Sequence, residues 1–224
     1  MTESPDESYR LAAVDLLGAI AYGELSAFER LVEDAQMAPG IAEKIAIGSM
    51  ATAEFANLER LVSRLEELGA DPAAAMQVFR ESFDGFHAHT APSDYYEGLI
   101  KAYVGDALAA DFYREIAAYL DPQTREVIIS SLEDTGQTAF IVEQVRAGIA
   151  RDHRLGGRLA LWGRRLMGEA LTQAQRVAGD RESLTALLAG GVDRPGLDLA
   201  ALGRMFARLT ERHAARMAEL GLEA

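Results

Sequence analysis

Apolar residues recur at helical spacing over long stretches of this chain, and strong helix breakers separate the stretches. The first stretch runs from about Tyr9 to Gln36 and stops at Ala38-Pro39-Gly40. The second runs from about Ile41 to Leu68 and ends at Gly69. A period of about 3.6 residues places these side chains on one face of a helix, and Gly and Pro end helices. The pattern therefore predicts long helices joined by short turns.

Capping residues predict two further long helices in the first two thirds of the chain. Ser93 can cap a helix that runs to Leu120, and Asp121-Pro122 starts one that continues to about Ala150. Residues 72–90 are expected to form one short helix and a loop. Three more helices are predicted at Arg154 to Val177, Ser183 to Leu188 and Leu197 to Leu220.

The composition agrees with an all-α fold and excludes several other classes. Alanine occupies 40 positions and cysteine none, so an all-β sandwich, a disulfide scaffold, a zinc-thiolate site and a cysteine nucleophile are excluded. We expect a polar tail over residues 1–8 and one helical domain over 9–224, with a four-helix core at 9–150 and a C-terminal helical extension at 151–224. The polar N-terminus is no secretory signal, and no apolar run reaches the roughly 18–20 residues of a membrane span. A cytoplasmic protein without membrane contact is expected.

Each of the four long helices has one carboxylate on its apolar stripe. These residues are Glu24, Glu54, Asp106 and Asp134. A carboxylate buried without a partner is costly, so four of them in one core need a metal ion, protons or polar neighbours. Glu54 and Asp134 are each followed, three residues later, by an amide, Asn57 or Gln137. An acid followed by an acid-x-x-ligand motif, used twice, is the layout of a carboxylate-bridged di-metal bundle.

The chain resembles the ferritin-like superfamily, and most closely the bacterial family of 2-methylthio-isopentenyl-adenosine tRNA hydroxylase-like proteins. The similarity lies in the segments AVDLLGAIAYGELSAFERLVEDA, ATAEFANLERLVSRLEELGADP, TAPSDYYEGLIKAYVGDALAADFYREIAAYLDP, LWGRRLMGEALTQAQRVAGDR and LTERHAARMAELGL. The resemblance implies an antiparallel ferritin-like four-helix bundle with additional C-terminal helices. It also implies a di-iron centre held by four acids and two Glu-x-x-His histidines.

The resemblance carries over to the acids but not to the histidines. Glu24, Glu54, Asp106 and Asp134 match the four acidic ligands, with Asp111 a less well phased alternative to Asp106. Asn57 and Gln137 stand where the two histidines are expected. Imidazole is a better iron ligand than a carboxamide oxygen, so these two replacements weaken the implied iron site.

Three interpretations of the acids follow. The site is degenerate, with acids and amides in a buried hydrogen-bond network, or it holds one hard divalent cation, or it holds two irons. The missing histidines favour the first, which implies no resident cofactor, no catalytic residue and a binding or assembly role. The alternative is a non-haem di-iron oxygen-activating hydroxylase acting on a modified tRNA nucleoside or a small molecule.

Other polar and aromatic residues receive less specific predictions. We expect His87 and His89 in an ordinary loop, and His153 and His213 on the surface. Three tyrosines are expected to flank the acids, either as core residues or as helpers in oxygen chemistry. They are Tyr22, Tyr103 and Tyr113.

Charge is distributed unevenly along the chain. Residues 1–145 carry 9 basic and 26 acidic side chains, a net charge of −17, whereas residues 146–224 carry 13 and 9, a net charge of +4. A basic stretch with Trp162 extends from Arg151 to Arg165. It suits docking onto the acidic core, which we favour, or contact with the phosphates of tRNA. The Ala-rich outer faces of the helices would also suit a homodimer.

Overall fold

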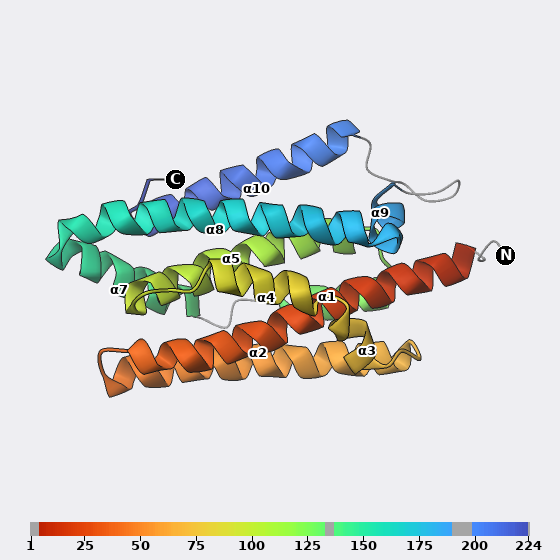
Figure 1. Cartoon of the computed structure of the whole chain (residues 1–224), viewed down its shortest axis with the longest axis horizontal. Coiled ribbons are helices and arrows are strands. Elements are labelled where there is room, and N and C mark those ends of the chain that lie inside the picture. Colours follow the sequence, from red (N-terminus) through yellow and green to blue (C-terminus); the bar gives the residue numbers. More distant parts are fainter. Residues whose placement is uncertain (1–4, 133–136, 190–198, 224) are drawn as a thin grey trace.

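The computed structural model describes residues 5–132, 137–189 and 199–223. These residues form helices and no strands, which confirms the predicted all-α class (Figure 1). The elements are α1 (Pro5–Asp34), η1 (Ala35–Met37), α2 (Ile41–Glu67), α3 (Pro72–Gln77), α4 (Arg80–His89), α5 (Tyr95–Ala117), α6 (Pro122–Ser131), α7 (Gln137–Arg151), α8 (His153–Asp180), α9 (Glu182–Ala189) and α10 (Leu199–Glu219).

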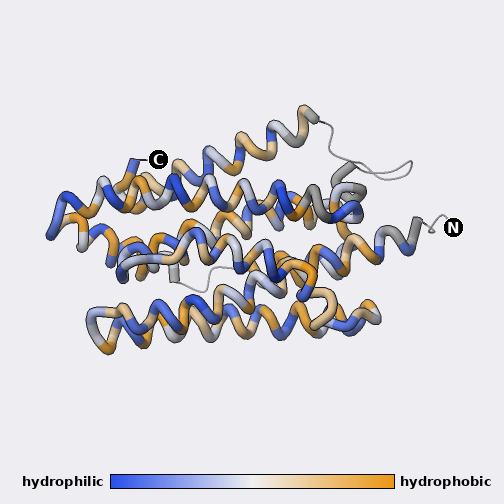
Figure 2. The backbone as a smooth tube through the Cα atoms, in the orientation of Figure 1, coloured by the Kyte–Doolittle hydropathy of each residue, from blue (hydrophilic) through white to orange (hydrophobic). Residues whose placement is uncertain are grey.

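The long helices lie side by side along the longest axis of the molecule. Helices α1 and α2 form an antiparallel hairpin with an extensive contact (Figure 1). Helix α5 packs against α6, α7 and α8, and α10 covers α5 and α8 on the side away from α2. Figure 2 shows apolar and polar residues alternating along each helix, as expected when one face of each helix is buried.

The core consists of two hydrophobic clusters that meet near the predicted acids. On α1 one cluster ends at Ala21 and the other begins at Leu31, with Glu24 between them. On α2 the clusters are separated between Ala51 and Leu58, where Glu54 lies. The two glutamates therefore occupy the layer in which the apolar core is interrupted.

The continuous helix predicted from Pro122 to Ala150 was wrong, because the structure has two helices there. Helix α6 ends at Ser131, and α7 begins at Gln137. Side chains from other helices take the carbonyls at the end of α6: Arg60 donates to Ser130 O at 3.2 Å and Arg114 to Leu132 O at 2.7 Å. Because these carbonyls accept hydrogen bonds from side chains of α2 and α5, they do not depend on backbone N–H donors from a longer helix.

The segment from Pro72 to Thr90 also differs from its prediction, since it forms α3 and α4 rather than one helix and a loop. The Asp71 side chain caps α3 by accepting from Ala73 N at 3.0 Å. Helix α4 includes His87 and His89, and it packs against α1 and α8. Helix α1 begins at Pro5, so the predicted polar tail is helical over residues 5–8.

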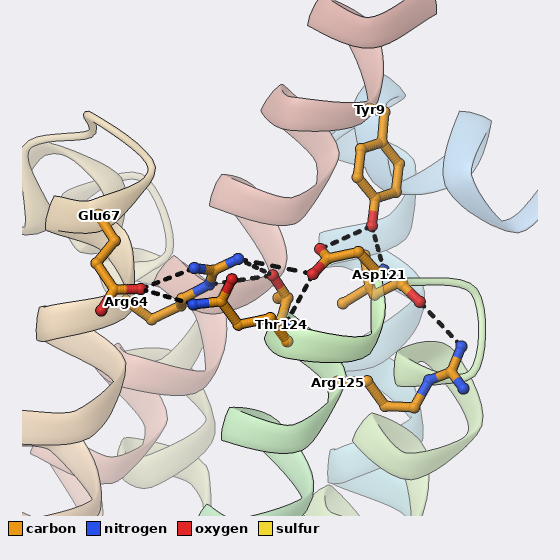
Figure 3. Close-up of polar contacts among 8 residues, drawn as sticks. Tyr9, Arg64, Glu67, Asp121, Thr124 and Arg125 are labelled. Carbon is orange, nitrogen blue, oxygen red and sulfur yellow. Dashed lines mark hydrogen bonds and ion pairs between the residues drawn. The ribbon is translucent and has the colours of Figure 1, made fainter.

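A polar network fastens one end of the bundle, where α1, α2 and α6 meet (Figure 3). Tyr9 donates to Asp121 Oδ2 at 3.0 Å, and Asp121 caps α6 by accepting from Thr124 N at 2.9 Å. The buried Arg64 guanidinium donates to Thr124 Oγ1 at 3.0 Å and to Glu67 at 2.7 Å. The start of α6 is therefore tied to two other helices by groups that satisfy one another.

The basic stretch of α8 docks onto the rest of the fold, as the favoured interpretation expected. Arg158 forms ion pairs with Asp94 and Glu97 at the start of α5. Trp162 donates to the Glu97 carbonyl at 3.0 Å, and Arg165 donates to the His89 carbonyl at 2.6 Å. These contacts join α8 to α4 and α5.

Helix α10 is attached to α5 by a second group of ion pairs. Asp111 is 3% exposed and lies 2.6 Å from Arg216 and 3.2 Å from Arg212. Glu115 accepts from Arg208 at 2.6 Å. A buried carboxylate with several arginine partners is satisfied, so Asp111 serves as an anchor for α10.

The first helix is long and apolar enough to be compared with a membrane-spanning helix. Tyr9–Met37 passes a test of length and hydropathy for such a span, contrary to the expectation that no stretch would. However, 56% of its most apolar window is buried inside the fold, as in the core helix of a globular protein. Length and composition are weak evidence for a span in that situation.

Helices α1 and α3 approach so closely at Gly18 that a methyl group would not fit. A Cβ atom added there would lie 2.5 Å from the Ala75 carbonyl oxygen, whereas one added at Gly48 would meet nothing within 4 Å.

We expect Gly18→Ala to destabilise the protein by about 1–3 kcal/mol through overpacking. The control Gly48→Ala should gain up to about 1 kcal/mol in helix propensity. Urea unfolding of both variants checks this, and equal effects would contradict the close α1–α3 packing.

Candidate functional site

A cavity of about 540 Å³ lies where the two hydrophobic clusters meet. Helices α1, α2, α4, α5, α8 and α10 contribute to its wall, which is mainly apolar. Polar groups also line it, including Glu24, Glu54, Asn57 and Asp106. A mainly apolar cavity of this size with convergent polar groups is typical of a small-molecule site.

Glu24, on α1, is the most perturbed acid of this cavity. It is 7% exposed, and its Oε2 atom has no hydrogen-bond partner in the described part of the chain. The pKa of Glu24 is raised well above its ordinary value, chiefly by burial. Hydrogen bonding with Glu54 and the negative charges of Glu54 and Asp106 raise it further, whereas the Asn57 amide works in the opposite direction.

The structure thus brings three predicted acids and one predicted amide to the same cavity. Glu54 is buried on α2, and Asn57, one turn later, is half-buried beside the acids. Asp106 is exposed on α5, yet its charge acts on Glu24 across the cavity. Burial and the neighbouring acids therefore favour the protonated form of Glu24.

The remaining predicted positions are the fourth acid, the second amide and the alternative acid on α5. Asp134 lies outside the described residues, and Gln137 begins α7 with a side chain that is not described either. Asp111, the less well phased alternative on α5, forms ion pairs with Arg114, Arg212 and Arg216.

The described part of the donor set does not make up a di-iron centre. Among the described residues, no group of three or more His, Cys, Asp or Glu side chains is arranged to hold a metal ion. An amide stands at position 57, where the implied motif has its first histidine. The orphaned Glu24 oxygen leaves room for a hydrogen-bond donor or a hard cation, but two irons would need more ligands than these residues supply.

Two of the three tyrosines lie at the cavity. Tyr113 is buried in its wall, and burial followed by the charges of Glu24 and Asp106 raises its pKa. Tyr103 also lines it and donates to Glu219 of α10 at 2.8 Å. Tyr22 is not part of the wall, since it donates to Asp84 on α4 at 2.7 Å.

The sequence analysis missed a second polar group of the same cavity, which contains Asp34, His87 and Lys101. Burial lowers the pKa of Lys101 to about 8 and raises that of Asp34 to about 6. Burial also lowers the pKa of His87 to about 3, so this imidazole is neutral. Lys101 could have been found, because it shares one helical stripe of α5 with Val104 and Leu108.

The histidine predictions have mixed outcomes. His153 is exposed, as expected. His213 is 4% exposed in α10 and lacks hydrogen-bond partners within the described residues, so its placement on the surface was wrong. Its helix packs on α5 and α8, a contact that its polar sequence neighbours did not reveal. His87 lines the cavity from α4, whereas His89 is exposed.

Comparison with solved structures identifies the fold. The chain is similar to a protein from Synechococcus described as protein 19 with aldehyde deformylating oxidase activity, with a TM-score of 0.72 and 18% sequence identity. The similarity covers 97% of this chain and 93% of that chain. At this identity the match establishes the fold alone, and it confirms the predicted ferritin-like bundle.

Comparison with curated proteins gives no match. A family described as "Ferritin-like domain, actinomycetes" matches residues 7–191. This range contains most of α1, all of α2 to α9, and the acids Glu24, Glu54 and Asp106. Because this match spans most of the chain, the protein belongs to the actinomycete family of ferritin-like domains.

Proposed function

We propose that this protein binds a small, largely apolar molecule in its interhelical cavity and performs no oxygen chemistry there. The proposal rests on one observation: a mainly apolar cavity of about 540 Å³ remains at the acids, while the amide Asn57 replaces an expected metal-binding histidine. Ligand sites in proteins have volumes of roughly 300–1,000 Å³ and a few polar groups that fix orientation.

In this proposal the Glu24–Glu54 pair provides the polar contact for the bound molecule. A protonated Glu24 carboxyl can both donate and accept a hydrogen bond. The buried Glu24 oxygen without a partner would gain one from a hydroxyl or amine of the ligand. The site would therefore be a degenerate form of the di-metal site that the family resemblance implies.

The alternative function is an oxygen-activating hydroxylase of the tRNA hydroxylase-like family, with a modified nucleoside or small molecule as substrate. Two observations support this alternative function. Three predicted acids line one cavity, and a protein with oxidase activity has a similar fold. We infer a cytoplasmic protein in either case, since the apolar α1 is largely buried in the bundle. Binding and metal measurements separate the two functions.

The first prediction concerns a neutral probe of the cavity. We expect octan-1-ol to raise the melting temperature by about 3–6 °C at a concentration near ten times its Kd, because it binds only the folded state. Ala27→Phe should abolish this shift, since Ala27 lines the cavity one turn after Glu24. Ala42→Phe is the matched control on an exposed position of α2. Equal shifts in all three proteins would place the probe elsewhere.

The second prediction concerns metal content. After anaerobic loading with Fe(II) and desalting, we expect the wild type to retain less than one iron ion per chain. The double variant Asn57→His/Gln137→His restores two imidazoles and should retain more. Elemental analysis measures both. About two iron ions per wild-type chain, the number in carboxylate-bridged bundles, would favour the hydroxylase instead.

The third prediction is a pH dependence of stability in the metal-free protein. The raised pKa of Glu24 means that the folded state holds this proton more tightly than the unfolded state. The stability that this proton gives the folded state is fully present below the ordinary pKa of 4.5. It is lost as the pH rises through the raised pKa of Glu24. Glu24→Gln removes this loss, so the variant should be more stable than the wild type at pH 8 and gain little at pH 4.

Each tenfold tightening of proton binding corresponds to about 1.4 kcal/mol. Urea unfolding of both proteins at the two pH values, with a chelator present, measures the difference. A Glu24→Gln variant that is less stable than the wild type at pH 8 would show that this acid is kept for stability, not for a ligand.

A further inference from the structure

Helix α5 carries three charged side chains on one buried stripe, and two of them are paired. Glu97, Lys101 and Asp111 are 7%, 6% and 3% exposed. Glu97 is paired with Arg158, and Asp111 with arginines of α10. The Lys101 Nζ atom has no hydrogen-bond partner among the described residues.

The surroundings of Lys101 do not compensate its charge fully. The charges of Asp34 and Glu33 favour its ammonium form, whereas that of Arg30 disfavours it. Neither acid forms an ion pair or hydrogen bond with Lys101 in the described structure. The Phe86 ring lies 5.8 Å from Nζ and offers a weak cation–π contact. A buried ammonium group with so little compensation is costly, and removing it would be neutral or stabilising for the fold alone.

A second unsatisfied atom of the cavity belongs to His87. Ser26 donates its hydroxyl hydrogen to the Gly23 carbonyl at 3.0 Å, so its oxygen accepts from His87 Nε2 at 3.2 Å. The proton of the neutral ring is therefore on Nε2, and Nδ1 is an acceptor to which no described residue donates. A neutral His87 does not compensate the charge of Lys101. The arginines that also line the cavity have acidic partners: Arg30 pairs with Glu33, and Arg114 and Arg216 pair with Asp111. Lys101 is therefore a buried cation of the wall without an ion-pair partner among the described residues.

We propose that the cavity binds an apolar carboxylate whose carboxylate group accepts hydrogen bonds from Nζ of Lys101 and whose apolar body lies along the cavity. This inference rests on the proposed function and adds the chemical class of the ligand and its orientation. The acids Glu24 and Glu54 disfavour binding of the ligand's carboxylate at their part of the cavity. The anionic end of the ligand is therefore directed to Lys101. Lys101 is a binding residue in this arrangement.

The test compares octanoate with octan-1-ol, which share a chain length and differ in charge. Calorimetric titration of the wild type should give at least about tenfold tighter binding of octanoate, as expected for a hydrogen bond to a charged group. Lys101→Met keeps the aliphatic stem and removes the charge, so octanoate should bind about 10- to 100-fold more weakly. Octan-1-ol binding should not change.

Lys44 provides a matched control, because it and Lys101 are the only lysines and Lys44 is exposed on α2. Lys44→Met should bind both probes like the wild type. In protein labelled with ¹³Cε-lysine, octanoate should shift the Lys101 resonance and leave that of Lys44 unchanged. This signal requires contact with Lys101 and not merely a change in stability.

The outcomes separate this inference from the proposed function. If octan-1-ol binds and octanoate binds no better, or if Lys101→Met keeps the preference for octanoate, the carboxylate assignment is overturned and the cavity remains a binding site. If neither probe binds the wild type, the proposed function fails and this inference fails with it. A loss of the preference in Lys44→Met would place octanoate on the surface and also overturn it.

Discussion

The ion pairs between acids of α5 and arginines of α8 and α10 hold the C-terminal helices on the bundle. Arg158 reaches Asp94 and Glu97, while Arg216 reaches the buried Asp111 at 2.6 Å. The opposite net charges of residues 1–145 and 146–224 thus have a structural role. Because α8 and α10 complete the cavity wall, its closure depends on these contacts.

The cavity itself lies where the hydrophobic packing is interrupted by charge. Buried acids at one part of its wall and a buried lysine at another are both unfavourable for folding unless something pairs with them. Such groups are commonly retained at sites where function outweighs stability. A ligand with a carboxylate for Lys101 would satisfy one of them.

The sequence predicted much of the fold and part of the site. The apolar periodicity located α1, α2 and α5, and the phase of the acids brought Glu24, Glu54 and Asp106 to one cavity. The break between α6 and α7 was not predictable, because Arg60 and Arg114 come from distant helices to take carbonyls at the end of α6. His213 was misplaced for a similar reason, since its surroundings are set by α10 packing against α5.

The sequence by itself determined the helical class and placed two acids, Glu24 and Glu54, on the inner faces of their helices. These properties are local, since they depend on residue type and on spacing within one helix. Only the tertiary structure decided which charges are paired. Glu97, Lys101 and Asp111 have the same helical phase, yet arginines from α8 and α10 neutralise the two acids and leave Lys101 at the cavity. Pairing depends on helices distant in the chain, whose positions no local pattern encodes.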